Sequence, residues 1–385
     1  MKLIKALLFP KVRLAATAEE RRRVYAFRYK IYIEEMKKTS PEADHKNKLL
    51  KDDLDEVADL LYLEKNGEVA ATLRINLLST LPRLEDYAEA FGINLFKGLE
   101  LNQIGYVSRL MVAKRWRSSL VMPSLLEAVF RQAKKLGCAV SLIHCVPSLT
   151  RLYERIGYRK YKNGFEMKGL GTQIPLLMVG DDLDYFKTVR SPFYGPAKEL
   201  FRDEHMKTWF ERTFPERHRD PSIGLLSVDD FWSYFSEHLR PEDIPLFKDL
   251  NHEEMKSFIG VGTTYKGNTG EVLLRQDDWG NEMYLVLNGR LTATRQTGKK
   301  RAQLAEFLNG DLFGEVALLS TAPRTATITA ETDFEVLVIS QTFLRKAMKR
   351  YPEISLKVLF NLSCLLSIRL KDTTDLLMGH SDSTT

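Results

Sequence analysis

The stretch GDLFGEVALLSTAPRTATITA, residues 310–330, decides how the C-terminal part of this chain folds. A short helix beginning near Gly314 would direct free backbone N–H groups at an anion. Arg324, nine positions after Glu315, could neutralise that anion with a forked set of donors, and Glu315 offers acceptors to a pair of sugar hydroxyls. The pattern predicts a site for a phosphate attached to a ribose. A barrel turn with an incidental Glu315–Arg324 ion pair is the alternative.

The sequence around this stretch has the texture of an all-β domain. Short alternating runs, such as EMYLVLNGRLTATRQ and FEVLVIS, are punctuated by glycines from Gly270 to Gly310. This spacing predicts a jelly-roll-like barrel. A long helical stretch follows from about Pro352 to Leu377. We therefore expect a barrel with flanking helices.

Residues 241–377 resemble the cyclic nucleotide-binding domain family, whose phosphate-binding cassette shares the pattern FGE-x-A-L followed by P-R-[AST]-A. The resemblance implies that Glu315 binds the ribose 2′-hydroxyl and that Arg324 binds the cyclic phosphate. It also implies that backbone groups of Gly314 and Val316, with the Thr325 hydroxyl, complete the cradle.

The last helix bears on the choice of base. NLSCLLSIRLKDTT resembles the dimer helix of the bacterial cAMP receptor regulators, so Arg369 and Thr373 are expected at the site and a homodimer through this helix is left open. The alternative is that these polar side chains only extend to solvent from the apolar face or compensate the dipole at the C-terminal end of the helix. We favour cAMP over cGMP as the effector. No helix-turn-helix pattern follows, so we expect no binding of nucleic acid.

The N-terminal half alternates helical and strand patterns. Thr17 and Glu20 form a capping-box pattern at the start of a predicted helix, and a Lys-Asn-Gly turn separates two strand-like runs. The order of the remaining runs predicts an α+β sheet domain. The predicted helices cover residues 17–38 and 124–137, and the predicted strands cover residues 58–67, 68–78, 106–112 and 139–146.

This half resembles the GNAT superfamily of acyltransferases. A strand, the basic turn KRWR with Arg115 and Arg117, and a helix stand where these enzymes grip the phosphate of a thioester donor. Tyr153, in RLYERIGYRKY, matches the tyrosine that can protonate a departing thiolate, which lowers the cost of its departure. The alternative for Tyr153 is an aromatic side chain that packs on the sheet.

A narrower resemblance is to the acyl-homoserine-lactone synthases and the related N-acyl amino acid synthases, which take acyl groups from acyl carrier protein. Paired carboxylates can hold an ammonium and accept a proton, and arginines can order a loop or hold a carboxylate. A surface ion-pair cluster is the alternative. The residues that match the motifs are Arg28, Tyr32, Asp52, Asp55, Arg74, Ser108 and Arg109.

Two departures from these synthases stand out. Many of them carry a glutamate two residues before the Ser-Arg pair, where this chain has Tyr106. The loop RSSLVM, residues 117–122, lacks the glycines that let a backbone approach a pyrophosphate. Acyl carrier protein, with a single phosphate, is therefore favoured over acyl-CoA as donor. A catalytically silent domain also remains open.

Charge and composition set the broader frame. The net charge is +6, and residues 1–240 carry 40 basic and 32 acidic side chains against 17 and 19 in residues 241–385. A basic half suits an acidic carrier protein. Three scattered cysteines predict neither disulfides nor a metal site, and they favour a reducing cytoplasm. The basic N-terminal peptide, residues 1–13, leaves a weak membrane contact open.

A chain of 385 residues favours more than one domain. We expect a GNAT-like N-acyltransferase domain over residues 1–195, a helical connector over 196–240 and a cyclic nucleotide-binding domain over 241–385. The predicted function is cAMP-regulated transfer of an acyl group to an amine such as an amino acid. A cAMP-regulated protein lysine acyltransferase and a non-catalytic cAMP sensor are the alternatives.

Overall fold

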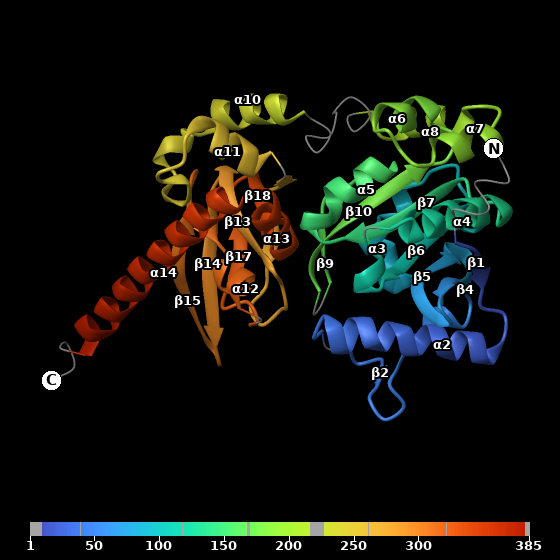
Figure 1. Ribbon diagram of the computed structural model, residues 1–385, viewed down its shortest axis with the longest axis horizontal. Coiled ribbons are helices and arrows are strands. Elements are labelled where there is room, and N and C mark those ends of the chain that lie inside the picture. The colour runs from blue at the N-terminus through green and yellow to red at the C-terminus, as the bar shows by residue number, and fades with distance from the viewer. Residues whose placement is uncertain are drawn as a thin grey trace. The chain divides into compact units, whose positions relative to one another are not determined.

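A computed structural model describes residues 10–38, 40–117, 119–167, 170–215, 227–260, 262–320 and 322–381 (Figure 1). The described chain forms two compact units. The first comprises residues 1–145, 152–165 and 174–221, and the second comprises residues 146–151, 166–173 and 222–385. Residues 1–9 of the predicted membrane-contact peptide and residues 216–226 of the predicted connector lie outside the described residues.

A mixed sheet of eight strands is the centre of the first unit in the part of the chain that the structure describes. Its order is β1-β4-β5-β6-β7-β10-β8, with β9 paired to β10, and β6 and β7 form its parallel pair. The strands are β1 (Val12–Leu14), β4 (Asp59–Lys65), β5 (Glu68–Leu77), β6 (Ile104–Val112), β7 (Val140–Cys145), β8 (Arg159–Lys160), β9 (Phe165–Met167) and β10 (Gly171–Val179); β2 (Ala43–Asp44) and β3 (Leu49–Leu50) form a separate pair.

Helices cover both faces of this sheet. Val24 and Tyr25 of α2 pack on Leu60 and Tyr62 of β4. Gln132 of α4 donates to the carboxylate of Asp59 at 2.7 Å. Because neighbouring side chains of a strand point to opposite faces, α2 and α4 lie on opposite faces. The helices of this unit are α2 (Ala18–Tyr29), α3 (Glu85–Phe91), α4 (Val121–Lys135), α5 (Thr150–Ile156), α6 (Leu183–Thr188), α7 (Tyr194–Leu200) and α8 (His205–Thr213).

Local signals explain where several elements begin and end. Thr17 and Glu20 form the predicted capping box at the start of α2. Asn66 and Gly67 both have positive φ angles in the two-residue turn between β4 and β5, as a tight hairpin requires. The helix predicted over residues 17–38 is only partly α-helical, because η1 (Lys30–Glu35) is a π-helix. The apolar spacing of this segment carries no sign of that wider turn.

Strands β6 and β7 separate partway along their length. Their pairing runs from Ile104 opposite Val140 to Tyr106 opposite Leu142, while β6 continues to Val112 and β7 to Cys145. Beyond Tyr106 the facing backbone groups of these two strands are not bonded to each other. Adjacent strands that separate in this way leave donors and acceptors for a ligand that lies between them.

Two four-stranded sheets form the barrel of the second unit, within the residues that the structure covers. Their orders are β11-β18-β13-β16 and β12-β17-β14-β15, and the neighbouring strands in both sheets are antiparallel. The strands are β11 (Thr263–Gly267), β12 (Val272–Leu274), β13 (Glu282–Asn288), β14 (Leu291–Thr297), β15 (Lys300–Phe307), β16 (Leu312–Phe313), β17 (Thr327–Ala330) and β18 (Phe334–Ser340). This is the predicted jelly-roll-like barrel.

Helices flank the barrel and share its core. Phe235 of α10, Phe258 of α11 and Phe343 of α13 are buried in one cluster with Leu285 and Leu337 of the sheet. The helices are α10 (Val228–His238), α11 (His252–Ile259), α12 (Glu315–Leu319), α13 (Gln341–Arg350) and α14 (Pro352–Ser381). In Figure 1, α14 runs past the barrel as one long helix.

The remaining short helical turns are η2 (Asp53–Asp55), η3 (Leu78–Thr80), η4 (Ile93–Leu95), η5 (Leu101–Gln103), η6 (Lys114–Trp116), η7 (Pro147–Leu149), η9 (Pro241–Asp243) and η10 (Pro245–Phe247). Among the described residues, no helix is both long enough and apolar enough to cross a membrane.

Candidate functional sites

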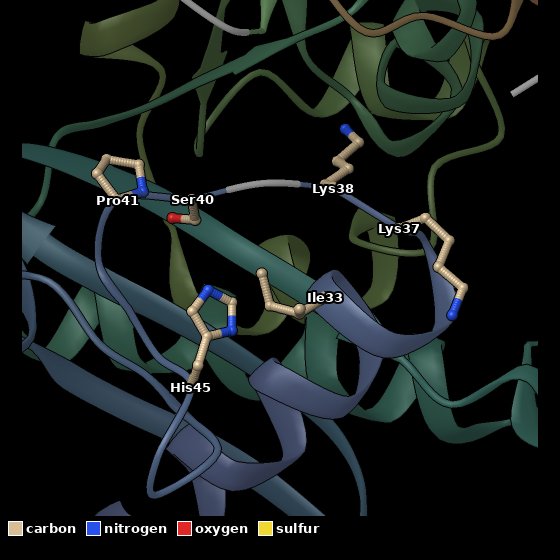
Figure 2. Close-up of a pocket in the computed structure, with 6 residues that line it drawn as sticks. All are labelled: Ile33, Lys37, Lys38, Ser40, Pro41 and His45. Carbon is tan, nitrogen blue, oxygen red and sulfur yellow. The ribbon is translucent and has the colours of Figure 1, made fainter. Parts of the chain in front are cut away.

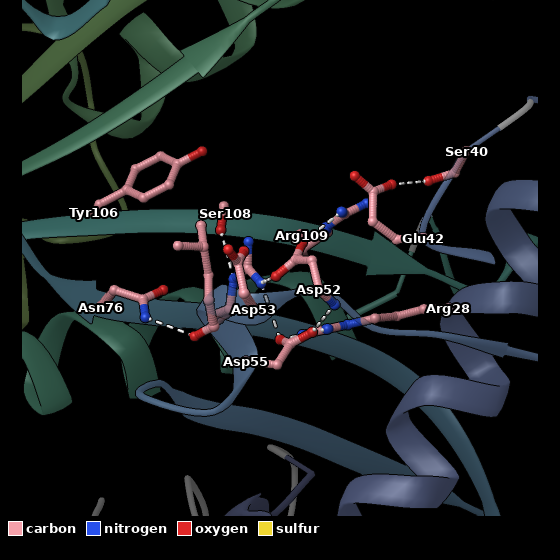
Figure 3. A network of polar contacts seen from close by, with 12 residues as sticks. Arg28, Ser40, Glu42, Asp52, Asp53, Asp55, Asn76, Tyr106, Ser108 and Arg109 are labelled. Carbon is pink, nitrogen blue, oxygen red and sulfur yellow. Dashed lines mark hydrogen bonds and ion pairs between the residues drawn. The ribbon is translucent and has the colours of Figure 1, made fainter. Parts of the chain in front are cut away.

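Three of the arginines predicted from the sequence meet both predicted aspartates in one chain of ion pairs in the first unit (Figure 3). Arg28 of α2 donates to Asp55 at 2.7 Å, and Arg74 of β5 binds both Asp55, at 3.0 Å, and Asp52. Arg109 of β6 binds the other oxygen of Asp52 at 2.6 Å. Three arginines and two carboxylates, from two strands, one helix and one loop, therefore act as a unit.

The loop that carries the two carboxylates is fixed by its own backbone. Asp55 ends the turn η2 and accepts the backbone N–H of Asp52 at 2.9 Å. Asn76 of β5 donates to the Leu54 carbonyl at 2.9 Å, which ties the same loop to the sheet. The Asp-x-x-Asp spacing thus brings both carboxylates to the same arginine.

One end of the cluster is closed and the other is open. The side chains of Arg28 and Asp55 are fully buried, whereas 11% of Asp52 and 20% of Arg109 is exposed. Burial would raise the pKa of Asp52, but the guanidinium groups of Arg74 and Arg109 outweigh it and lower the pKa to about 2. A small zwitterion could therefore meet a carboxylate and a guanidinium at the open end, while the closed end is structural.

Two more predicted residues lie next to the open end. The Ser108 hydroxyl accepts from Nε of Arg74 at 3.0 Å. The ring of Tyr32 lies under the guanidinium of Arg109, with 5.8 Å between the guanidinium carbon and the ring centroid. Arg109 itself has a φ of 55°, which is rare for a residue other than glycine. The strand therefore bends where its side chain joins the cluster.

Tyr106, which stands where many related synthases carry a glutamate, pairs with His144, a residue that the sequence analysis did not identify. The Tyr106 hydroxyl lies 2.9 Å from Nε2 of His144 on the neighbouring strand β7. Tyr106 stands two residues before Ser108, so both side chains lie on the same face of β6 (Figure 3). Phe91 and Phe165 pack around His144, with ring centroids at 6.2 and 5.8 Å. The sequence signal that could have identified His144 is its position as the one histidine in the apolar run AVSLIHCV.

The other predicted substrate residues do not join this cluster. Arg115 pairs with Glu68 at 2.6 Å and Arg117 pairs with Glu35, and both arginine side chains are about half exposed. Tyr153 packs edge to face on Tyr158, and burial raises its pKa. These contacts agree with the alternative that Tyr153 is a packed aromatic side chain. Its role in protonating a thiolate stays a prediction.

A separate surface cavity lies at the end of the π-helix η1 (Figure 2). It has a volume of about 480 Å³. It is lined by Ile33, Lys37, Lys38, Ser40, Pro41 and His45. None of the residues predicted from the sequence is among them.

A pocket of about 170 Å³ in the barrel of the second unit collects the residues predicted to bind a cyclic nucleotide. Six of the seven line it, namely Gly314, Glu315, Val316, Arg324, Thr325 and Arg369. Gly314 has a φ of 80° and precedes the short helix α12, as the expected cradle requires. Apolar side chains such as Leu304 and Ile328 complete the wall.

The three charged residues of this pocket, Glu315, Arg324 and Arg369, have ionic partners within the same unit. Arg324 donates through Nη1 to the carbonyl of Glu282 at 2.7 Å, and its Nη2 lies 3.2 Å from the Glu282 carboxylate. Glu315 accepts from Nη1 of Arg369 at 2.7 Å. Both Glu315 and Arg324 are more than nine-tenths buried. The contacts with Glu282 thus orient the Arg324 side chain before any ligand binds. The same carboxylate lies where it would compete with an anionic ligand for the guanidinium.

Thr373 is not among the described residues that line this pocket. Its side chain is exposed and its hydroxyl donates to the Arg369 carbonyl, one turn back along α14. The structure instead adds Glu282, which sequence reasoning missed because it precedes the cassette by more than thirty residues.

One group of possible metal ligands occurs among the described residues: Asp181, Asp203 and His205. Asp181 accepts the backbone N–H groups of Met206 and Lys207 at 2.9 and 3.0 Å. Its carboxylate is thereby used to hold the start of α8, so this group is explained by the fold.

Comparisons with known proteins divide the chain in the same way. Residues 23–180 match the family model described as N-acyl amino acid synthase FeeM, and residues 267–351 match the model described as cyclic nucleotide-binding domain. The chain therefore joins an N-terminal acyltransferase domain of that synthase type to a C-terminal cyclic nucleotide-binding domain. This confirms the predicted families and the multidomain fold class.

Curated relatives match parts of the chain. The cAMP-dependent protein kinase regulatory subunit of Colletotrichum orbiculare is 31% identical over 120 residues, which are 30% of this chain and 30% of that protein. Patatin-like phospholipase domain-containing protein 6 of Homo sapiens is 36% identical over 95 residues, which are 24% of this chain and 7% of that protein. The chain therefore spans less than a third of the length of either relative.

Solved structures also match parts of the chain. The catabolite activator protein of Thermus thermophilus is 30% identical and has a TM-score of 0.33, covering 36% of this chain and 63% of that one. A cyclic nucleotide-binding domain from Methylobacillus flagellatus is 26% identical, with a TM-score of 0.36, covering 39% of this chain and 85% of that one.

Proposed function

We propose that the protein is an N-acyltransferase whose activity is controlled by cAMP. The first unit transfers an acyl group from the thioester of acyl carrier protein to the amine of an amino acid, and the second unit binds the effector. The proposed setting is the cytoplasm, where carrier protein and cAMP meet. The observation that carries the proposal is the assembled cluster from Arg28 to Arg109 beside the point where β6 and β7 separate.

The cluster supports an amino acid as acceptor because its open end offers both signs of charge. The Asp52 carboxylate would hold the acceptor's ammonium or amine, and Arg109 would hold its carboxylate. Arg74 orients the Asp52 carboxylate, and the ring of Tyr32 orients the Arg109 guanidinium. A lysine side chain on a protein lacks the carboxylate, so it would leave Arg109 without a counterpart.

The separated strands support a thioester donor. An acyl thioester placed between β6 and β7 would face backbone groups that, beyond Tyr106 and Leu142, the two strands do not bond to each other. Backbone N–H groups aimed at the carbonyl oxygen would stabilise the negative charge that develops when an amine attacks. The basic excess of residues 1–240 would attract the acidic carrier protein that brings this thioester. Arg115 and Arg117, both on the surface, are the proposed contacts for its phosphate.

The pocket of the second unit supports a cyclic nucleotide as effector. Glu315 would accept from the ribose 2′-hydroxyl, and Arg324 would donate to the cyclic phosphate. Arg369, bound to Glu315, would connect the nucleotide to helix α14. We infer cAMP as the nucleotide, because the relatives that this chain resembles here include kinase regulatory subunits that are cAMP-dependent by name.

The exposed face of α14 supports pairing with a second copy of the chain. Leu356, Phe360 and Ile368 are 70%, 67% and 57% exposed and share one face of the helix with Cys364. Apolar side chains in such a stripe are typical of helix–helix interfaces. Light scattering on the full chain tests this: a dimer that Phe360→Glu converts to a monomer supports it, and a monomeric wild type contradicts it.

One assay tests the enzyme assignment. The full chain is incubated with acyl carrier protein thioester or acyl-CoA, with free amino acids or a lysine peptide as acceptor. Released thiol is followed by colorimetry and the N-acyl product by mass spectrometry. We expect an N-acyl amino acid from the carrier protein thioester. An acylated lysine peptide from acyl-CoA would support the protein lysine acyltransferase instead, and no thiol release under any condition would support a non-catalytic sensor.

A further inference from the structure

The carboxylates of the ionic cluster are poor candidates for removing a proton from an amine. Asp52 is bound by two arginines, which hold its pKa at about 2. Asp55 is bound by Arg28 and Arg74 and is fully buried. A general base works best when its pKa lies near the working pH. The cluster can therefore bind and orient an acceptor, but proton removal needs another group.

Such a group lies on the same face of the sheet. Burial raises the pKa of Tyr106 to about 12, so at neutral pH its hydroxyl keeps its proton. The nitrogen 2.9 Å away, Nε2 of His144, accepts that proton in the tautomer that carries the ring hydrogen on Nδ1. The tyrosine oxygen still has lone pairs available for an N–H donor. Tyr106 thus has the geometry of a relay between a bound amine and an imidazole.

The position of the pair fits the reaction. Tyr106 is the last residue of β6 that pairs with β7, and His144 follows the point of separation by two residues. Tyr106 also lies close enough to Arg74 and Asp52 for their charges to influence its ionisation. His144 is half-buried between Phe91 and Phe165, which shield it from bulk water without enclosing it. The pair therefore lies at the point where β6 and β7 separate, on the same face of β6 as Ser108, which binds Arg74 of the ionic cluster.

We propose that Tyr106 and His144 form the proton relay of N-acyl transfer, an inference that rests on the proposed function. Tyr106 is the catalytic residue that touches the acceptor nitrogen, and His144 is the base that acts through it. In this chain the relay would remove the proton from the amine, which Asp52 cannot do while it is paired with Arg74 and Arg109.

The proposed step balances as follows. The acceptor enters as a free amine after losing one proton to solvent, and its nitrogen attacks the thioester carbonyl carbon. As the C–N bond forms, an N–H proton passes to the Tyr106 oxygen, and the tyrosine proton passes to Nε2 of His144. The C–S bond then breaks, the thiolate leaves with the electron pair, and the imidazolium returns its proton to the sulfur through Tyr106. The products are an amide and a thiol.

The test uses the full chain and steady-state kinetics of N-acyl amino acid formation. His144→Ala and Tyr106→Phe should each lower kcat by roughly 10²- to 10⁴-fold, the usual contribution of acid–base catalysis, with the KM of both substrates nearly unchanged. Added imidazole should restore turnover of His144→Ala in proportion to its concentration. It should not help Tyr106→Phe, which lacks the connecting hydroxyl.

A matched control exists in the same unit. Nδ1 of His45 lies 2.9 Å from the Tyr29 hydroxyl, a second tyrosine–histidine pair that lies outside the ionic cluster. His45→Ala should keep the wild-type kcat. A fully active Tyr106→Phe, or a His144→Ala variant with the kcat of the wild type, would overturn the relay. A wild type that forms no N-acyl product would instead contradict the proposed function, and the two failures are therefore distinguishable.

Discussion

Nη2 of Arg324 lies 3.2 Å from Oε2 of Glu282, so the arginine predicted to bind a cyclic phosphate already faces a carboxylate. Both side chains are more than nine-tenths buried. A bound phosphate would bring a second negative charge to the same guanidinium. Glu282 therefore orients Arg324 before the nucleotide binds and competes with the ligand for it.

This competition predicts tighter binding when the carboxylate is neutralised. Glu282→Gln keeps the size of the side chain but removes its charge, so we expect the Kd for cAMP to fall roughly three- to tenfold, by about 1 kcal/mol. Isothermal titration calorimetry on the full chain measures it. Glu306→Gln, in an exposed pair with Arg290, should leave the Kd unchanged. Weaker binding by Glu282→Gln would mean that orientation of Arg324 outweighs the repulsion.

The closed end of the ionic cluster predicts a large effect on stability. Asp55→Ala would leave the buried guanidinium groups of Arg28 and Arg74 without their shared partner, which should cost about 3–5 kcal/mol of the free energy of unfolding. Urea unfolding of the full chain, followed by circular dichroism, checks this. Glu68→Ala removes the partner of the exposed Arg115 and should cost at most about 1 kcal/mol. Equal losses in the two variants would contradict the assignment of a closed structural end.

Asp52 predicts how stability responds to acid. Arg74 and Arg109 hold its pKa at about 2, below the ordinary value of 3.8. A depressed pKa stabilises the fold above the ordinary value, and this stabilisation is lost as the pH falls through the folded pKa. The contribution is about 2 kcal/mol and should disappear between about pH 4 and pH 2. Unfolding of the wild type and of Asp52→Asn, measured at pH 6 and pH 3, should show the stability gap shrinking at the lower pH; a constant gap would contradict the ion pairing.

Much of the fold could be predicted because its signals are local. The Thr17–Glu20 capping box, the Asn66-Gly67 hairpin turn and the helix that begins after Gly314 all depend on residues within a few positions of one another. The π-helical turn after Tyr29 could not be predicted. The apolar spacing that indicates a helix is too similar for a π-helix, whose hydrogen bonds join residues five apart, and an α-helix, whose hydrogen bonds join residues four apart.

The candidate sites were predictable to the extent that short motifs carry them. The Asp-x-x-Asp and Ser-Arg patterns named the members of the ionic cluster, but their pairing depends on strands and a helix meeting in space. The contacts of Tyr106 with His144 and of Arg324 with Glu282 join residues 38 and 42 positions apart. Contacts between residues so far apart produce no repeating pattern in the sequence from which they could be predicted. Thr373 was expected at the pocket from the resemblance of its helix to the dimer helix of the cAMP receptor regulators, yet its exposed hydroxyl donates to the Arg369 carbonyl of its own helix.

Coupling between the two units predicts a reciprocal effect on binding. If cAMP alters the affinity for the acyl carrier substrate, the substrate must alter the affinity for cAMP by the same factor, about 5–150-fold for coupled sites. Calorimetric titration of cAMP, with and without a non-hydrolysable acyl carrier analogue, measures that factor. Identical dissociation constants, with the analogue shown to be bound, would mean that the two sites are merely tethered.

The most direct measurement of the whole account is the rate of N-acyl amino acid formation by the full chain as a function of cAMP concentration. Arg324→Ala serves as the comparison, because it removes the partner proposed for the cyclic phosphate. Loss of a buried charge partner should weaken cAMP binding by about 2–5 kcal/mol. We predict that cAMP changes the wild-type rate in a saturable manner, and that Arg324→Ala forms the product at a rate that does not respond to cAMP at the same concentrations. A wild-type rate indifferent to saturating cAMP, or an Arg324→Ala variant with the wild-type response, would contradict the account.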